Sequence, residues 1–230
     1  MTDCAAWPSL PRPETAAMAA VLFDMDGLLL DTERLCLAVW LDAALQIGAP
    51  IVRTVPLACI GLSEKATRAK VLELCGPDYP YDAVHARFRE LFAERVTRDG
   101  IAHRPGLLAL LDLLAGRGLP LAVATSTRRS SAERSLERAG IRSRFKALAC
   151  GDEVRRGKPA PDVFLLAAER LGAAPGACVG FEDSAAGLRS LAAAGIRSVF
   201  VKDLVDPPAE VMRTVWRQYP DLAAAAEMFG

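Results

Sequence analysis

From residue 105 onward, short apolar segments alternate with amphipathic segments, and this alternation constrains the fold more than any other feature. The apolar segments span residues 119–124, 146–149, 177–181 and 198–201. Helical patterns separate them, at residues 107–114, 131–138, 162–171 and 185–194. Strands that alternate with helices form a parallel sheet with helices packed on both faces. We therefore predict an α/β fold with a doubly wound, Rossmann-like sheet.

A further apolar segment, residues 19–23, comes earlier in the chain and runs into Asp24-Met25-Asp26-Gly27. It is typical of a buried parallel strand that breaks into a loop at its carboxyl end. Residues 31–104, which follow, show only helical patterns. The sequence therefore predicts a helical region inserted between the first strand and the rest of the sheet. Residues 1–17, rich in proline and alanine, are expected to be a flexible N-terminal arm.

Asp24 and Asp26 are the first candidate site residues. They lie two positions apart, so an extended backbone places both carboxylates on one side, and Gly27 lets the chain turn there. Two such carboxylates repel each other unless a cation joins them, and a hard divalent ion such as Mg²⁺ prefers oxygen ligands. Taken alone, the same residues also fit an ordinary acidic turn, because Asp and Gly are common in turns.

Three later loops, each at the end of a predicted strand, carry complementary groups. Thr125 and Ser126 offer hydroxyl and backbone donors for phosphate oxygens, and the Lys158 ammonium can neutralise phosphate charge. Glu182 and Asp183 add a second acidic pair that suits a metal ion. Each residue also has an ordinary structural explanation. Thr125 fits the end of a strand, Lys158 fits a solvated surface charge, and Asp183 fits a helix N-cap. Together, at the edge where ligands bind to such sheets, they favour a phosphate site.

Four segments of the sequence resemble the signature motifs of the haloacid dehalogenase superfamily. They are Phe23-Asp24-Met25-Asp26-Gly27-Leu28-Leu29-Leu30-Asp31-Thr32, Val123-Ala124-Thr125-Ser126, Gly157-Lys158-Pro159 and Gly180-Phe181-Glu182-Asp183-Ser184. The similarity is to the β-phosphoglucomutase-like phosphatases with a helical cap, and it extends over residues 19–201. It implies a Mg²⁺-dependent phosphomonoester hydrolase that acts on a small phosphorylated metabolite, such as a sugar phosphate or a nucleotide-type compound.

The resemblance implies a role for each motif residue. Asp24 would be the nucleophile that forms a phospho-aspartate, and Asp26 would be the general acid and base. Thr125 would bind the phosphate, while Lys158 would orient Asp24 and neutralise charge. The magnesium ligands would be the Asp24 carboxylate, the Asp26 carbonyl and Asp183.

Further roles follow from the same resemblance. Glu182 would stand next to the metal ligands without binding the ion. Apart from the resemblance, the residues themselves make Gly27, Ser126 and Arg128 candidates for substrate binding, by their place in the turn after Asp26 and in the phosphate loop; for Arg128 and its neighbour Arg129, a solvated helix start is an equal alternative. Residues 33–104 would form a mobile cap of four helices between the core segments 18–32 and 105–230. The cap would close over the site and exclude water, with hinges near residues 32–34 and 102–105.

Two cap positions depart from the sugar mutases of that branch. Those enzymes carry a histidine in the first cap helix, where this chain has Cys36, which we interpret as a packing residue. They also carry an arginine that grips a second phosphate, where this chain has Glu64. A carboxylate there would repel a phosphate by a few kcal/mol. Hydrolysis is therefore favoured, with a sugar-phosphate mutase and, more distantly, a non-catalytic phospho-aspartate switch as alternatives.

Composition narrows the possible partners. Lys plus Arg and Asp plus Glu are both 28, so no charge excess indicates nucleic acid or a membrane surface as a partner. No apolar run reaches the length of a membrane span. The six cysteines are scattered, which is typical of a reduced protein rather than of a zinc site or a disulfide framework. We therefore expect a cytoplasmic monomer.

Overall fold

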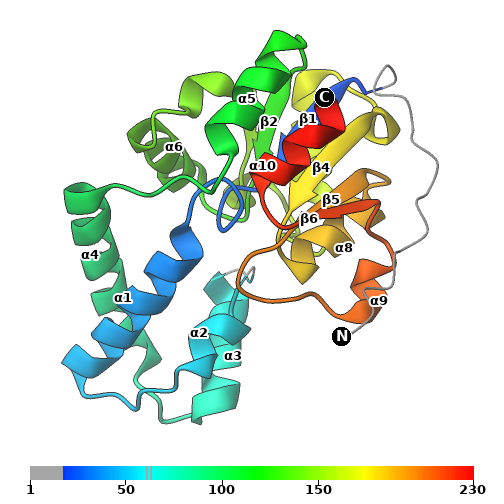
Figure 1. The fold of residues 1–230 in the computed structure, drawn as a ribbon. Coiled ribbons are helices and arrows are strands. Elements are labelled where there is room, and N and C mark those ends of the chain that lie inside the picture. The colour runs from blue at the N-terminus through cyan, green and yellow to red at the C-terminus, as the bar shows by residue number, and fades with distance from the viewer. Residues whose placement is uncertain (1–17, 61, 63) are drawn as a thin grey trace, which may run out of the picture.

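The computed structural model describes residues 18–60, 62 and 64–230, so the predicted arm at residues 1–17 lies outside the described residues. The strands of this part of the chain form one six-stranded sheet, in which every neighbouring pair is parallel (Figure 1). In chain order they are β1 (Ala20–Phe23), β2 (Leu121–Ala124), β3 (Ala147–Ala149), β4 (Cys178–Glu182), β5 (Arg197–Val201) and β6 (Arg217–Tyr219). The predicted doubly wound sheet is confirmed.

The strand order, β3-β2-β1-β4-β5-β6, places β1 at the centre of the sheet. Val21 of β1 pairs with Leu121 of β2 on one side and with Val179 of β4 on the other. The strand order reverses between β1 and β4, which makes this the topological switch point of the sheet. At such a point the loops that follow the two strands diverge and leave a crevice at the carboxyl edge of the sheet. The loops after β1 and β4 are therefore placed to share a ligand.

Helices cover both faces of the sheet because alternate strand residues point in opposite directions. Phe23 and Phe181 belong to a core that also contains apolar residues of α5 (Leu107–Gly116), α6 (Arg129–Arg138) and α10 (Leu222–Ala225). Leu22 faces the opposite way, onto α7 (Asp162–Leu171). The remaining core helices are α8 (Ala185–Ala193) and α9 (Ala209–Met212). The two apolar layers fix β1 between them.

Within the described residues, four helices lie between β1 and α5 and stand beside the sheet (Figure 1). They are α1 (Thr32–Ile47), α2 (Thr54–Ala58), α3 (Glu64–Cys75) and α4 (Tyr81–Asp99). They share a small apolar cluster of their own, around Trp40, Val71 and Tyr81. The described part of this region therefore has the predicted helical character, while its movement as a cap stays a prediction.

The two connections between this helical region and the sheet run side by side. Asp31 donates its backbone N–H to the Ala102 carbonyl at 2.9 Å, and Arg104 donates to the Leu29 carbonyl at 3.0 Å. The buried carboxylate of Asp203, in the loop after β5, forms ion pairs with Arg34 at 2.7 Å and with Arg104 at 2.8 Å. An ion cluster thus holds both predicted hinges against the core.

The edge strand β6 was not predicted from the sequence. Its residues, Arg217, Gln218 and Tyr219, carry no apolar alternation, and among the described strands it pairs with β5 alone. A short polar edge strand of this kind depends on backbone pairing, which leaves no periodic signal. Among the helices of the described residues, none combines the length and the hydrophobicity that a membrane span requires.

Candidate active site

Asp24 occupies the first position after β1, where its backbone N–H donates to the Phe181 carbonyl of β4 at 3.0 Å. Its carboxylate accepts a hydrogen bond from Lys158, and Lys158 also donates to Glu182 Oε1 at 2.7 Å. The Lys158 side chain is only 3% exposed, and its ammonium lies 4.7 Å from the centre of the Phe164 ring. Three of the predicted loops therefore converge in a buried ionic cluster.

Burial and charge compete in this cluster. Burial opposes ionisation of the Asp24 carboxyl more strongly than Lys158 favours it, so the pKa of Asp24 rises to about 8. Glu182 and Asp26 add repulsion to this rise. Burial alone would lower the pKa of Lys158, but the two carboxylates raise it above its ordinary value, so its ammonium stays charged. The cluster has more negative than positive groups, which favours a further cation.

Asp26 points toward the loop after β2 rather than toward Lys158. Its Oδ2 accepts hydrogen bonds from Thr127 Oγ1 at 2.7 Å and from Thr125 Oγ1 at 3.3 Å. The backbone N–H of Thr127 in turn donates to Thr125 Oγ1 at 3.0 Å. Asp26 is thereby fixed beside the hydroxyl predicted to bind phosphate, in a position suited to proton transfer. Thr127 follows Ser126 directly in the sequence, but its role was not predicted.

The acidic groups of Asp24, Glu182 and Asp183 form a cluster that fits a metal ion, with ligand atoms all within 4.8 Å of one another. Asp183 Oδ1 is buried and has no hydrogen-bond partner within the described residues. Glu182 is already engaged, since Oε1 accepts from Lys158 and Oε2 accepts from the Ser184 N–H at 2.6 Å. The donor set is hard oxygen, as Mg²⁺ prefers. Asp183 is thus free to bind the ion, and Asp24, which Lys158 engages at one oxygen, can join it, while Glu182 suits a supporting position.

The Asp26 carboxylate is not part of that acidic cluster, which agrees with the expectation that Asp26 would offer its carbonyl. Gly27 has a local reason to be glycine: its φ is +84°, and a Cβ there would come within 2.5 Å of Asp183 Oδ2. Its N–H donates to the Leu30 carbonyl at 2.9 Å and to Thr32 Oγ1 at 3.2 Å. The structure thus gives Gly27 a role in the turn, and its contact with substrate stays a prediction.

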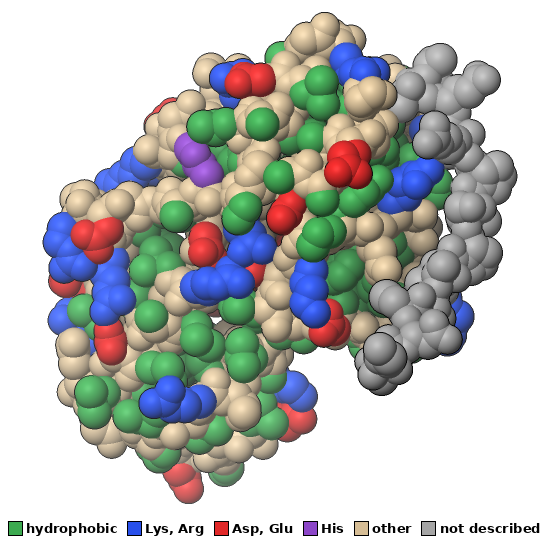
Figure 2. Space-filling model, viewed as in Figure 1, with side chains coloured by type: hydrophobic (Ala, Val, Ile, Leu, Met, Phe, Trp, Pro, Cys, Tyr) green, Lys and Arg blue, Asp and Glu red, His purple; other side chains and the backbone are tan. Residues whose placement is uncertain are grey.

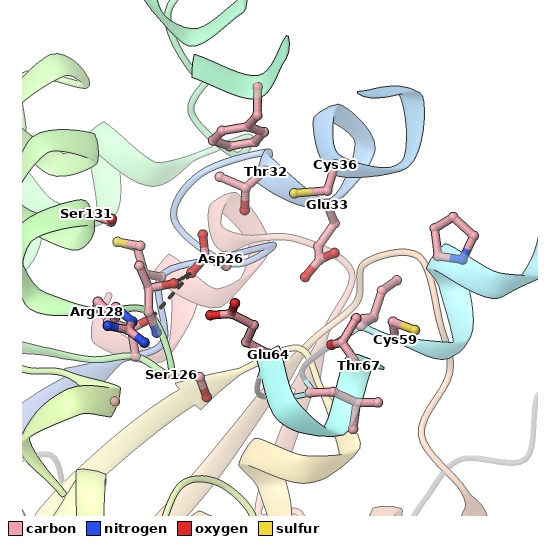
Figure 3. A pocket seen from close by; sticks show the side chains of 18 of the residues that line it. Asp26, Thr32, Glu33, Cys36, Cys59, Glu64, Thr67, Ser126, Arg128 and Ser131 are labelled. Carbon is pink, nitrogen blue, oxygen red and sulfur yellow. Dashed lines mark hydrogen bonds between the residues drawn. The ribbon is translucent and has the colours of Figure 1, made fainter. Parts of the chain in front are cut away.

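A cavity of about 1000 Å³ lies between these loops and the inserted helices. Ser126 and Arg128, both predicted to bind substrate, line it together with Asp24, Thr125 and Lys158. Figure 3 shows Asp26, Glu33 and Glu64 pointing into the same space. Figure 2 shows the molecule hollowed between the upper part and the lower, helical part. The cavity is large enough for a small phosphorylated molecule.

Arg129 does not share the surroundings of Arg128. Its guanidinium pairs with Glu153 at 2.8 Å and with Glu133 at 3.0 Å, and it donates to the Leu148 carbonyl at 2.8 Å. These contacts join β3 and the loop after it to α6, and Arg129 is not among the residues that line the cavity, which favours a structural role for it.

The inserted helices add two residues beside the catalytic carboxylates. Burial, with repulsion from Asp26 and Asp24, raises the pKa of Glu33 to about 8. Cys36 lines the cavity, and burial followed by the charge of Glu33 raises the pKa of its thiol well above the usual value. A protonated thiol is a poor nucleophile, which supports the packing interpretation of Cys36. Glu33 was not singled out from the sequence, because an exposed glutamate on a helix leaves the same pattern.

The stability of the metal-free protein is expected to depend on pH, and bound metal is expected to reduce that dependence. Without metal, Asp24 has a folded pKa of about 8, raised above its ordinary value near 4. Its contribution to stability is thus full below pH 4 and is lost as the pH rises through 8. Added Mg²⁺ at one hundred times its dissociation constant should restore about 2.7 kcal/mol.

Thermal unfolding with EDTA and with Mg²⁺, at pH 6 and pH 9, would measure this effect. We expect the metal-free protein to melt lower at pH 9, and Mg²⁺ to raise the melting temperature more at pH 9 than at pH 6. Asp183→Asn should weaken the response to Mg²⁺, whereas Asp78→Asn, at an exposed position between α3 and α4, should leave it intact. A melting temperature insensitive to Mg²⁺ at both pH values would contradict the metal assignment.

A buried carboxylate at the central strand end, held by an amine and flanked by hydroxyls and acids, is the arrangement of an enzyme that transfers phosphoryl groups. The comparisons with known proteins agree. Residues 18–195 match the model of the haloacid dehalogenase-like hydrolase family, and the chain belongs to this family.

Three relatives illustrate the match. The phosphorylated carbohydrates phosphatase of Thermotoga maritima is 32% identical over 183 residues, which are 80% of this chain and 84% of that protein. The fructose-1-phosphate phosphatase YqaB of Escherichia coli is 33% identical over 184 residues, which are 80% and 96% of the two chains. The crystal structure of CbbY from Rhodobacter sphaeroides, in complex with phosphate, superposes with a TM-score of 0.73 at 27% identity, covering 90% of this chain and 95% of that one. The chain is accordingly an enzyme, a phosphatase.

Proposed function

We propose that this phosphatase hydrolyses the phosphomonoester of a small phosphorylated metabolite, a sugar phosphate in the first place, through a phospho-aspartate on Asp24. The observation that carries the proposal is the convergence of Asp24, Lys158 and Asp183 in one cavity. The names of two relatives, which refer to phosphorylated carbohydrates and to fructose 1-phosphate, support the substrate class.

In the first step, a carboxylate oxygen of Asp24 attacks phosphorus while the bond to the leaving oxygen breaks, and Asp26 protonates that oxygen. In the second step, water attacks phosphorus and gives a proton to Asp26, the bond to Asp24 breaks, and inorganic phosphate leaves. The hydrogen bonds from Thr125 and Thr127 hold Asp26 in place for both transfers. Asp24 can attack only when its carboxyl is ionised. Because burial raises the pKa of that carboxyl to about 8, a cation beside it is needed to favour the ionised form.

Lys158 has a second task in these steps. Its ammonium is fixed between Asp24 and Glu182, so it can offset negative charge on the nucleophile as the phosphate approaches. A bound Mg²⁺, held by Asp24, Asp183 and the Asp26 carbonyl, would supply further charge neutralisation at the phosphate oxygens. Thr125 and Ser126 would bind those oxygens from the loop after β2.

Phosphate release from a panel of small phosphate esters would test the function. With Mg²⁺ present we expect release of inorganic phosphate from at least one sugar phosphate. Chelation with EDTA should reduce the rate of release by about 100-fold or more, because the metal ion stabilises charge in the transition state by several kcal/mol. Readdition of Mg²⁺ should restore the rate. No release from any ester in the panel would refute the proposal.

The same assay separates hydrolysis from the mutase alternative. A sugar-phosphate mutase would isomerise a hexose phosphate, need a bisphosphate primer and release little inorganic phosphate. Glu64 disfavours that alternative, because its carboxylate faces the cavity where a second phosphate would have to bind (Figure 3).

A further inference from the structure

The ion cluster at the two connections to the inserted helices is asymmetric. The Asp203 carboxylate, in the loop after β5, does not line the catalytic cavity, and its side chain is only 2% exposed. Its Oδ1 pairs with both Arg34 and Arg104, whereas its Oδ2 is buried and has no hydrogen-bond partner within the described residues. Buried polar atoms are normally bonded. The idle Oδ2 therefore indicates that the cluster has a second arrangement in which this oxygen is used.

The two arginines of this cluster are bound differently. Arg104 is largely buried, pairs with Asp203 at 2.8 Å and donates to the Lys202 carbonyl at 3.0 Å, so it is anchored to the core. Arg34, in the first turn of α1, is half exposed, and it reaches Asp203 at 2.7 Å and Asp31 at 2.9 Å through a single nitrogen, Nη1. A buried carboxylate that loses its last partner is strongly destabilised, but Asp203 keeps Arg104 when Arg34 leaves. The contact of Arg34 is therefore the one that can break.

The idle oxygen of Asp203 fits such a break. A guanidinium is a planar fork whose nitrogens match the two oxygens of a carboxylate, and bidentate pairs of this kind are strong. While Arg34 occupies Oδ1, Arg104 pairs with the same oxygen through Nη1. Departure of Arg34 would leave Arg104 to take both oxygens of Asp203. The carboxylate is thus satisfied in two arrangements, one with α1 held and one with α1 released.

The first turn of α1 carries side chains that belong to the catalytic site. Thr32 Oγ1 accepts a hydrogen bond from the Gly27 N–H at 3.2 Å. Glu33 points into the cavity (Figure 3), and its Cγ lies 3.0 Å from the place that a Cβ of Gly27 would take. Arg34 is the next residue of the chain. Its contact with Asp203 therefore determines how firmly this turn is held against the turn that follows β1.

We propose that Asp203 is a positioning residue that acts as a catch: through Arg34 it holds the first turn of α1 against the catalytic loops while phosphate occupies the cavity, and it releases that turn when phosphate leaves. This inference rests on the proposed phosphatase function, in which inorganic phosphate is the product. Asp203 touches neither the substrate nor the reacting atoms. Its effect is therefore on the rate at which the product leaves rather than on the chemical steps.

The dissociation rate of inorganic phosphate would test the catch without turnover. The full-length protein, loaded with phosphate and Mg²⁺, is mixed in a stopped-flow instrument with a fluorescent reporter that captures released phosphate. Arg34→Gln should speed release by about 5-fold, the value of one hydrogen bond. Both contacts of Arg34 use one nitrogen, so a lysine can replace them, and Arg34→Lys should release phosphate within about twofold of the wild-type rate. Asp203→Asn should speed release as Arg34→Gln does.

Arg189→Gln is the matched control. The Arg189 side chain is 48% exposed, against 47% for Arg34, and its ion pair with Glu210 at 3.0 Å joins two core helices, α8 and α9. Its loss should leave the release rate unchanged. Thermal unfolding of each variant completes the comparison, because a purely structural role of Arg34 would lower the melting temperature and leave the release rate as it is. Raising the salt concentration from about 0.05 M to about 0.5 M should narrow the difference between wild type and Arg34→Gln, because salt screens an exposed charge.

Hydrogen exchange provides a readout that needs no ligand. The backbone amides of Asp31 and Arg104 donate to carbonyls across the two connections, at 2.9 and 3.0 Å. If Arg34 holds these connections together, both amides should exchange faster in Arg34→Gln than in the wild-type protein, by about the same 5-fold factor. The Arg189→Gln control should exchange there like the wild type.

The outcomes separate this inference from the function on which it rests. A wild-type release rate in Arg34→Gln, or release from Arg34→Lys as fast as from Arg34→Gln, would overturn the catch. If Asp203→Asn fails to fold, the two Arg34 variants decide; if phosphate does not bind, unchanged exchange of the two amides would overturn it. If release and exchange change as expected but the wild-type protein hydrolyses no ester, the proposed function fails while the catch stands.

Discussion

Replacing Asp24 with asparagine is expected to lower phosphate release by about 10⁴-fold or more, because the amide cannot form the covalent intermediate. The substitution keeps the shape of the side chain, and Lys158 retains Glu182 as an ion-pair partner at 2.7 Å. Burial already opposes the charge of Asp24 in the metal-free protein. The variant should therefore fold, and the loss should appear in kcat rather than in stability.

Steady-state phosphate release and thermal unfolding, measured on the same preparations, would check this prediction. Asp78→Asn makes the same chemical change at an exposed position away from the cavity and should leave the rate within about twofold. Incubation of the wild-type protein with a slow phosphate donor, followed by acid quench and mass spectrometry, should detect phosphate on Asp24 and none in the asparagine variant. Activity in Asp24→Asn near the wild-type rate would exclude Asp24 as the nucleophile.

The parts of the site that sequence could predict are those fixed by strand ends. Asp24 and Asp183 each follow an apolar run, and parallel strands place such residues on one edge of the sheet whatever the exact strand order. For Lys158 this guide is weaker, since its loop follows the predicted strand at residues 146–149 but the residue itself lies just before α7, and its assignment relied more on the motif that surrounds it. The structure places it against Asp24 because the loop packs on α8, with Ser190 Oγ donating to the Ala160 carbonyl at 2.6 Å.

The parts that sequence could not predict depend on contacts between distant segments. Thr127 bonds Asp26 across 101 positions of chain, and nothing in its local pattern distinguishes it from a residue that starts a helix. Glu33 carries the pattern of an ordinary helical surface residue, yet it points into the cavity; Glu64, which also points there, drew notice only through the resemblance to the sugar mutases. Their significance follows from how the inserted helices sit over the core, which is a matter of tertiary packing rather than of local sequence.

Asp26→Asn should distinguish the phosphatase from a phospho-aspartate switch. If Asp26 is the general acid and base, its loss should slow turnover by about 10² to 10⁴-fold. Asparagine can still accept hydrogen bonds from Thr125 and Thr127, which hold the carboxylate at 3.3 and 2.7 Å, so the position of the side chain should be preserved. The rate should fall without a matching loss of substrate binding.

The leaving group gives this prediction a sharper form. Esters with a good leaving group need no proton for the first step, so 4-nitrophenyl phosphate should phosphorylate Asp24 of the Asp26→Asn protein faster than a sugar phosphate does. Water still needs a base in the second step, so the phospho-enzyme should accumulate and be visible by mass spectrometry after acid quench.

A switch protein would show a long-lived phospho-aspartate with Asp26 intact. Thr127→Val, which removes one of the hydrogen bonds to Asp26 but no ionisable group, should slow both esters by a smaller and similar factor. Equal rates for Asp26→Asn and wild type, with any ester, would mean that the proton comes from elsewhere.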